Sequence, residues 1–112
     1  MSMDETRPTQ GMIDGVLAIP QRRADIERHV NALGSVASAV LGRSLAAMRA
    51  NQAEAQAGIA MIDSDPGQAS DRAALRLKLI DMWVTSTLYA DAIERELDRR
   101  SVKSDGGVQK VH

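Results

Sequence analysis

The stretch DSDPGQ at residues 63–68 decides the fold, because it interrupts a helical pattern that otherwise runs through residues 22–100 without a proline. Pro66 cannot continue an incoming helix, and it disfavours helical backbone at Asp65. The same proline suits the first turn of a new helix, for which Asp65 is a good N-cap and Gln68 a capping-box partner. The sequence therefore predicts two long helices joined by a six-residue turn.

Before this turn, apolar residues recur in alternating steps of four and three, beginning at Ile26, Val30 and Leu33. The stripe then drifts around the helix, as an ideal helix drifts against a 3.5-residue repeat. Its later members are Leu41, Leu45, Met48, Ala55, Ile59 and Ile62. The stretch NQAEAQAG at 51–58 is rich in helix formers but poor in large apolar side chains. We expect either one long helix here or two helices with a break near 51–58.

After the turn, a second helix is expected from about Pro66 to Arg100. One apolar stripe on it comprises Leu75, Leu79, Met82, Ser86, Ala90, Ile93 and Leu97, and a second set, Leu77, Ile80, Val84 and Leu88, widens it. Two acid-before-base pairs at i,i+4, Asp91 with Arg95 and Glu96 with Arg100, suit an exposed last part of a helix. The fold class predicted is all-α, a long helical hairpin.

The chain divides by composition into three parts. Residues 1–20 hold two of the three prolines and read as a flexible N-terminal segment with a short apolar patch, which could dock on the hairpin as an amphipathic turn. Residues 21–100 form the hairpin domain, with its turn at 63–68. The tail SVKSDGGVQKVH at 101–112 is polar and aperiodic, and is predicted to be disordered.

Composition excludes several classes of protein. Aromatic residues make up only 2% of the chain, which argues against an all-β sandwich. A formal net charge of −1 gives no basic excess to hold a nucleic acid. No apolar run is long enough to span a membrane, and the first ten residues lack the pattern of a signal peptide. We expect a cytoplasmic protein, or one exported by a dedicated machine without a cleaved signal peptide.

No pattern for catalysis or metal binding is found. The chain has no Cys, no Glu-x-x-His pair and no nucleophile elbow, P-loop or dinucleotide fingerprint. Asp25 and His29, four residues apart, are typical of a surface contact on a helix. Asp63 and Asp65 begin like a calcium loop, but Pro66 breaks that pattern. We therefore predict a non-enzymatic protein with no catalytic residue, cofactor, metal or small-molecule substrate.

A lone hairpin would leave part of the widened apolar stripe in water, and contiguous exposed apolar surface usually marks an interface. We therefore expect a four-helix bundle, completed by dimerisation or by a protein partner. The candidate interface comprises Leu75, Leu79, Met82, Trp83, Leu88 and Tyr89, together with Gly34, Ser38 and Gly42 from a row of small residues on the first helix. Two alternatives stay open: alanine-rich helices produce such rows by chance, and the two aromatic residues could be buried anchors of the bundle.

A family resemblance is carried by Ser64-Asp65-Pro66 at the turn and by the run LRLKLIDMW at 75–83. Over roughly residues 60–100 the chain resembles the small helical proteins of type III secretion, namely the needle and inner-rod subunits and their coiled-coil chaperones. The resemblance implies a protein that masks or presents helical surfaces and performs no chemistry, with Leu79, Met82, Trp83 and Leu88 as contacts.

Two departures from this family matter. Its needle and rod subunits end in an apolar helix that polymerises, whereas this chain ends in a polar tail, and its first helix is longer and richer in alanine. Both departures favour a chaperone-like or adaptor hairpin over a polymerising subunit. The alternative from another class is a dimeric helical-bundle regulatory or accessory subunit unrelated to secretion, which genomic neighbourhood would separate from a secretion component.

Overall fold

The computed structural model describes the backbone of residues 7–64 and 69–111, with the side chains of 7–64 and 72–101. The described chain consists of helices and short connections, without a strand, which confirms the predicted all-α class. Its elements are α1 (Gln10–Leu17), α2 (Pro20–Ala32), the 3₁₀ turn η2 (Leu33–Ser35), α3 (Ser38–Ser64) and α4 (Ala69–Val111). Residues 65–68 of the predicted turn, with the capping box proposed there, lie outside the described residues.

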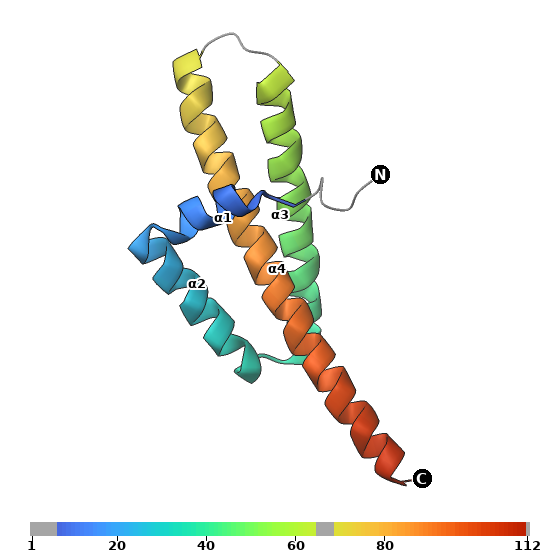
Figure 1. Ribbon diagram of the computed structural model, residues 1–112. Coiled ribbons are helices and arrows are strands. Elements are labelled where there is room, and N and C mark those ends of the chain that lie inside the picture. Colours follow the sequence, from blue (N-terminus) through green and yellow to red (C-terminus); the bar gives the residue numbers. More distant parts are fainter. Residues whose placement is uncertain (1–6, 65–68, 112) are drawn as a thin grey trace.

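Helices α3 and α4 run antiparallel and make the most extensive contact in the molecule (Figure 1). The drifted apolar stripe predicted on the first helix faces α4, since Leu41, Ala55 and Ile59 are all buried. Ala55 and Ile59 pack with Trp83 of α4 in the core, and Met12 of α1 closes this cluster.

Both alternatives for this region, one continuous helix and a break near 51–58, are wrong, because residues 51–58 lie within α3 and the break lies elsewhere. The chain instead leaves the helix at Leu33–Ser35, where η2 is followed by extended backbone at Val36. The Ser35 hydroxyl donates to the carbonyl oxygen of Ala32, a local bond that competes with continued helix. Arg100 of α4 then binds the carbonyl oxygens of Leu33 and Gly34, so the break is stabilised from outside the helix.

The N-terminal segment, expected to be flexible, contains α1. Thr9 caps α1 by accepting a hydrogen bond from the backbone N–H of Met12, and Pro20 occupies the first turn of α2. Val16 and Ile26 are buried, and both α1 and α2 pack on α4. These two short helices cover the middle of the widened stripe of α4, where Val84 is fully buried, but not Leu77 at its start, which is 68% exposed. We call the part of the molecule in which α1 and α2 pack on α4 the body.

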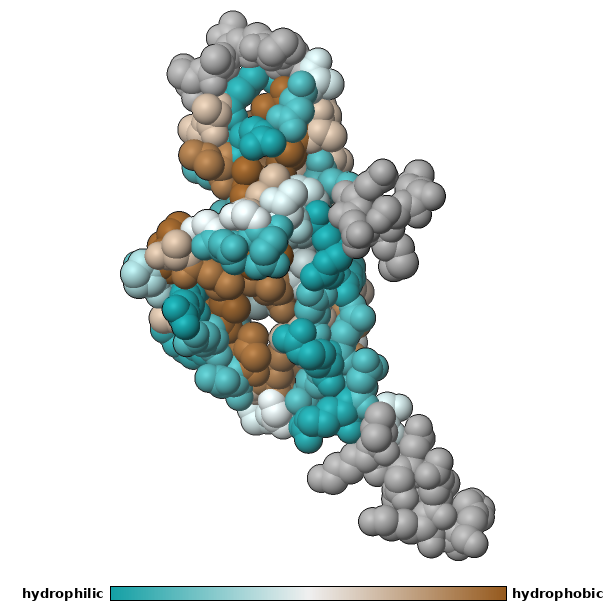
Figure 2. Space-filling view, viewed as in Figure 1, coloured by the Kyte–Doolittle hydropathy of each residue, from teal (hydrophilic) through white to brown (hydrophobic). Residues whose placement is uncertain are grey.

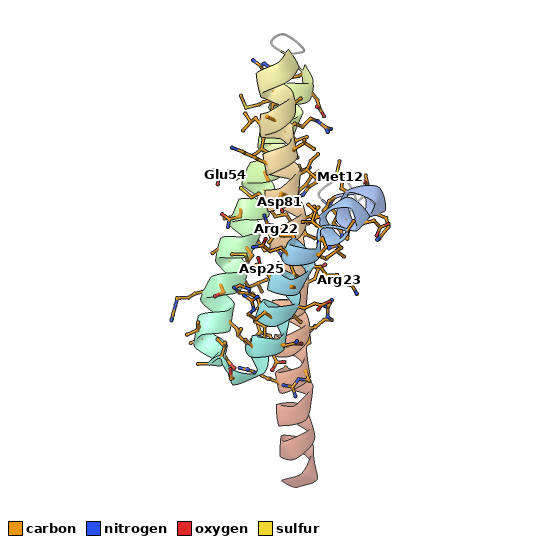
Figure 3. All side chains as sticks on the ribbon, turned by 90° about the vertical axis from the view of Figure 1, so that its left-hand side faces the viewer. Met12, Arg22, Arg23, Asp25, Glu54 and Asp81 are labelled. Carbon is orange, nitrogen blue, oxygen red and sulfur yellow. The ribbon has the colours of Figure 1, made fainter. Side chains whose placement is uncertain are left out.

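Ion pairs fix the short segments to α4. Arg22 of α2 donates to Asp81 at 2.7 Å (Figure 3). Arg7, before α1, makes two hydrogen bonds to Asp91, and Arg49 of α3 reaches Asp91 as well. Asp91 thus pairs across helices instead of with Arg95. The other predicted pair, Glu96 with Arg100, is present at 2.8 Å.

The helix α4 continues to Val111, so the backbone of 101–111 is helical and not disordered as predicted. Extending an existing helix needs no new nucleus, and the tail has no proline to end it; Gly106 and Gly107 each oppose the extension by about 1 kcal/mol relative to alanine. At the other end of the molecule, α3 and α4 extend beyond α1 with no third described helix beside them (Figure 1). We call this part, residues 60–64 and 72–78, the arm.

Candidate partner-binding surfaces

The arm exposes large apolar side chains. Met61 of α3 is 72% exposed, and Leu77 and Leu75 of α4 are 68% and 49% exposed. Arg76 lies between the two leucines and binds both carboxylate oxygens of Asp63, at 2.8 and 3.2 Å, which clamps α4 to α3. Since α1 and α2 end below the arm, nothing in the described chain covers these apolar groups as Val84 is covered in the body.

The structure separates the predicted interface residues of α4 into groups. Leu75 is exposed in the arm. Trp83 is buried in the core of the monomer, and Leu79 and Met82 are half-buried against the same cluster. Leu88 and Tyr89 are half-buried in the body. The surface inferred from the helical stripe is therefore largely closed inside one chain, by α3 on one side and by α1 and α2 on the other.

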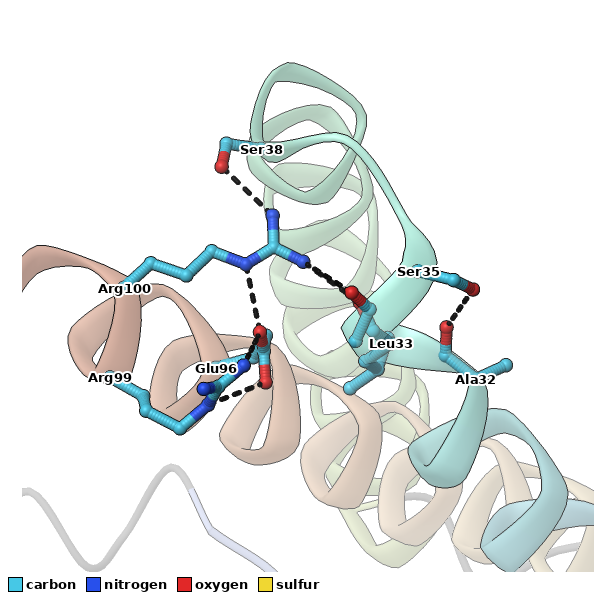
Figure 4. A network of polar contacts seen from close by, with 8 residues as sticks. Ala32, Leu33, Ser35, Ser38, Glu96, Arg99 and Arg100 are labelled. Atoms are coloured by element: carbon cyan, nitrogen blue, oxygen red, sulfur yellow. Dashed lines mark hydrogen bonds and ion pairs between the residues drawn. The ribbon is translucent and has the colours of Figure 1, made fainter. Parts of the chain in front are cut away.

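The predicted row of small residues on the first helix is also divided. Gly34 belongs to η2 and Ser38 begins α3, and both bind Arg100, which reaches the Gly34 carbonyl oxygen and the Ser38 hydroxyl (Figure 4). Gly42 lies in α3 with open space around its Cα. These two binding partners of Arg100 are thus part of the contact that holds η2 and the start of α3 on α4.

A different set of small residues forms the side of α3 that faces away from α4. This α3 outer face comprises Ala39, Arg43, Ala46, Ala50, Ala53, Ala57 and Ala60, all exposed, with Val40 and Met61 on its edge. Its members alternate steps of four and three, the spacing of a coiled-coil seam. Figure 3 shows Glu54, next to this seam, pointing away from the other helices. A row of small residues taken every four positions from Gly34 meets this face only at Ala46 and Ala50, whereas the alternation of four and three follows its whole length.

An apolar cleft of about 360 Å³ lies between α2, α3 and α4. Its apolar lining includes Val30 and Leu33 from the α2 side, Val40 and Met48 from α3, and Ile93 from α4. Apolar side chains gather along the inner side of α2 in the space-filling view (Figure 2). Its polar lining residues are His29, Ser44 and Tyr89. The cleft was not predicted from the sequence, because the apolar periodicity indicated a continuous helix where α2 and α3 are separate.

His29 and Tyr89 meet at the wall of the cleft, with their rings stacked at a centroid distance of 5.1 Å. The Nδ1 atom of His29 lies 2.9 Å from the carbonyl oxygen of Asp25, and because that oxygen only accepts, Nδ1 carries the proton. Burial raises the pKa of the Tyr89 hydroxyl, and the charge of Asp25 raises it further, against the opposing charges of Arg22 and Arg28. Tyr89 is therefore a neutral hydroxyl at physiological pH.

Other chemistry finds no support in the described residues. No group of three or more His, Cys, Asp or Glu side chains that could hold a metal ion occurs among them. Within the same residues, no helix is both long and apolar enough to cross a membrane. The carboxylates of Asp63, which is exposed, and Glu96, which is half-buried, have pKa values below their ordinary range, in both cases because they accept hydrogen bonds from arginine. The lowered pKa of Asp63 comes from its ion pair with Arg76, which joins α3 to α4. The lowered pKa of Glu96 comes from its ion pairs with Arg99 and Arg100 within α4.

Comparison with known proteins adds no family to this picture. No protein-family model matches the chain, and neither the comparison with curated proteins nor that with solved structures gives a significant match. The function therefore has to be argued from the surfaces of this chain.

Proposed function

We propose that this protein is a non-enzymatic helical interaction module that associates with a second copy of itself along the α3 outer face. The observation that carries the proposal is the composition of that face. An exposed helix face normally carries polar and charged side chains. Over α3, the exposed seam from Ala46 to Ala60 is alanine alone; Arg43 continues it toward the start of α3, and Arg49 and Glu54 flank it on either side.

The edge of the seam supports an antiparallel arrangement. Val40, 40% exposed, and Met61 lie 21 residues apart, which is three heptads, and so share one edge. Pairing two copies about a two-fold axis near Asn51 puts Val40 of each copy beside Met61 of the other. Alanine on both sides lets the two helices approach to the short end of the usual 8–10 Å separation between axes.

This arrangement keeps the expected dimer but changes its packing. The α3 outer face points away from α4, so the two copies of α3 lie at the centre and each α4 lies outside. A square four-helix bundle, as expected from the sequence, would need α3 and α4 to offer one common face. Leu75 and Leu77 of α4 lie in the arm and remain exposed in this dimer. Their exposure favours a second candidate role, in which the module is a chaperone or adaptor that covers a helix of another protein.

The experiment is the absolute mass in solution by light scattering on a sizing column, over a range of concentrations. We expect twice the chain mass of 12.1 kDa at high concentration. Ala50→Glu should shift the protein to the monomer, since it buries an unpaired carboxylate near the two-fold axis at a cost of several kcal/mol. Ala24→Glu, the same change at an exposed alanine of α2, is the matched control and should leave the mass unchanged.

Two results would contradict self-association along α3. One is a monomer at every concentration tested. The other is a dimer that Ala50→Glu leaves intact. Asp substitutions at Leu79 or Trp83 are unsuitable for this test, because both side chains pack in the core of the monomer and their loss would unfold it.

A further inference from the structure

We propose that the cleft between α2, α3 and α4 is a binding site for an uncharged, mainly apolar small molecule that carries one hydrogen-bonding group. The proposal goes beyond self-association, because the cleft and the α3 outer face are separate surfaces that share only Val40 at their edges. A volume of about 360 Å³ falls at the lower end of small-molecule sites, which run from roughly 300 to 1,000 Å³.

The shape of the cleft favours a compact ligand over a helix from another protein. The C-terminal end of α2 and the start of α3 converge on the η2 connection (Figure 1). Leu33 and Val36 of this connection are among the residues that line the cleft, so the connection closes one end of it. A helix lying in the groove would have to run out through this connection, whereas a small molecule can fill a cleft with one closed end.

The lining sets the chemistry of the ligand. No Asp, Glu, Lys or Arg is among its residues, so a charged group would lose its hydration without gaining a partner. Apolar side chains from three helices provide most of the surface. Ser44 and Tyr89 bring two hydroxyls, and Tyr89 accepts at most a long contact of 3.4 Å from Nδ1 of His29. A single hydroxyl, carbonyl or N–H group on the ligand matches this lining.

The His29–Tyr89 stack forms part of the wall of the cleft. The two rings connect α2 with α4 and lie beside the apolar lining residues Val30 and Ile93. Protein interiors are otherwise packed with few voids larger than a water molecule. An apolar space of this volume therefore leaves contacts unmade that a ligand would supply, and that is the physical basis for binding.

The test uses N-phenyl-1-naphthylamine, an uncharged apolar fluorophore with one N–H group, titrated into the full chain. We expect saturable binding at one site per chain. Ser44→Phe fills the cleft from α3, and Ala32→Phe fills it from α2; each should weaken binding about tenfold or more, which corresponds to about 1.4 kcal/mol. Ala24→Phe, at an exposed position of α2 outside the cleft, should bind as the natural sequence does.

Three results would overturn the proposal. The first is the absence of saturable binding to the natural sequence. The second is full binding by both filled variants while their circular dichroism and thermal unfolding show them folded. The third is binding that falls as the protein concentration rises, which would assign the cleft to a side chain of a second copy. Ala50→Glu should bind the fluorophore normally, so failure of self-association and failure of the cleft site are distinguishable.

Discussion

Two glycines of α3 form a matched pair that reports how closely α3 packs on α4. A Cβ at Gly42 would meet nothing within 4 Å, whereas a Cβ at Gly58 would lie 2.9 Å from Cδ1 of Leu79. Gly42→Ala should therefore stabilise the fold by about 1 kcal/mol through helix propensity alone. Gly58→Ala brings the same gain in helix propensity, but the new methyl group would displace the side chain of Leu79, which packs beside Ile59. We therefore expect Gly58→Ala to leave the free energy of unfolding unchanged or to lower it. Urea unfolding in the Ala50→Glu background, which removes association, measures both; equal gains would contradict this close contact.

Asp91 gives a pH dependence whose sign follows from its partners. Burial raises the pKa of its carboxyl, but the hydrogen bond and charge of Arg7 and the charge and hydrogen bond of Arg49 outweigh burial, and the pKa is lowered. A lowered folded pKa means that the stabilisation is present above the unfolded value of about 3.9 and is lost as pH falls through the folded value. Asp91→Asn should thus destabilise at pH 7 and lose its effect near pH 2, as urea unfolding at both pH values would show. A difference that stays constant with pH would count against these pairs.

The end of α2 depends on one side chain of α4. The guanidinium of Arg100 donates to the carbonyl oxygens of Leu33 and Gly34 at 3.0 and 3.3 Å and to the Ser38 hydroxyl at 2.9 Å. Arg100→Ala should cost about 1–2 kcal/mol, since hydrogen bonds from a charged group contribute more than neutral ones and the side chain is partly exposed. Amide hydrogen exchange at 33–36 should also become faster.

Arg99 is the matched control for this prediction. It lies next to Arg100 and binds Glu96 only within its own helix, and its side chain is 61% exposed. Surface ion pairs of this kind contribute roughly 0–1 kcal/mol. Arg99→Ala should therefore stay within about 0.5 kcal/mol and leave exchange at 33–36 unchanged. If the two alanine variants behave alike, Arg100 does not stabilise the break.

The helices could be predicted from the sequence, but the break between α2 and α3 could not. Periodicity alone predicted all-α structure and the stripe of α3 that faces α4. The contact of Arg100 with the Gly34 carbonyl oxygen joins residues more than sixty positions apart, and no local pattern at Gly34 reveals it. The α3 outer face was missed by a smaller error. A row taken every four residues, as from Gly34 to Ser38 and Gly42, turns by about 40° per step and leaves the seam, whereas alternating steps of four and three stay on it.

The α4 interface residues show the same limit at the level of the site. Leu75 and Trp83 were both predicted as interface residues of α4, and the sequence offers no way to tell which of them is core. The structure separates them through α1, whose Met12 covers the core cluster at Trp83 and stops short of Leu75. The cleft was beyond prediction for the same reason, since it exists only where α2 and α3 diverge from a common connection.

The whole molecule is long for its chain length. Its radius of gyration is 17.1 Å and its extents are 64 × 34 × 22 Å, whereas a compact domain of this size has a radius of roughly 13 Å. The excess length comes from the two ends of the molecule. At one end is the arm, where α3 and α4 pack without a third described helix, and at the other is the C-terminal part of α4. Such a region buries less apolar surface for each ordered residue than the body does.

This uneven burial predicts how the molecule opens. Amides of the arm, at 60–64 and 72–78, should exchange with solvent faster than those at 83–93, where Val84, Ala90 and Ile93 are buried by the other helices. Association along the α3 outer face should then slow exchange at 60–64 as protein concentration rises, because that segment carries Ala60 and Met61 of the seam. Hydrogen–deuterium exchange at two concentrations measures both effects, with Ala50→Glu as the variant in which the second should vanish. Equal protection of arm and body would refute the proposed difference in burial, and concentration-independent exchange at 60–64 would remove this segment from any interface between copies.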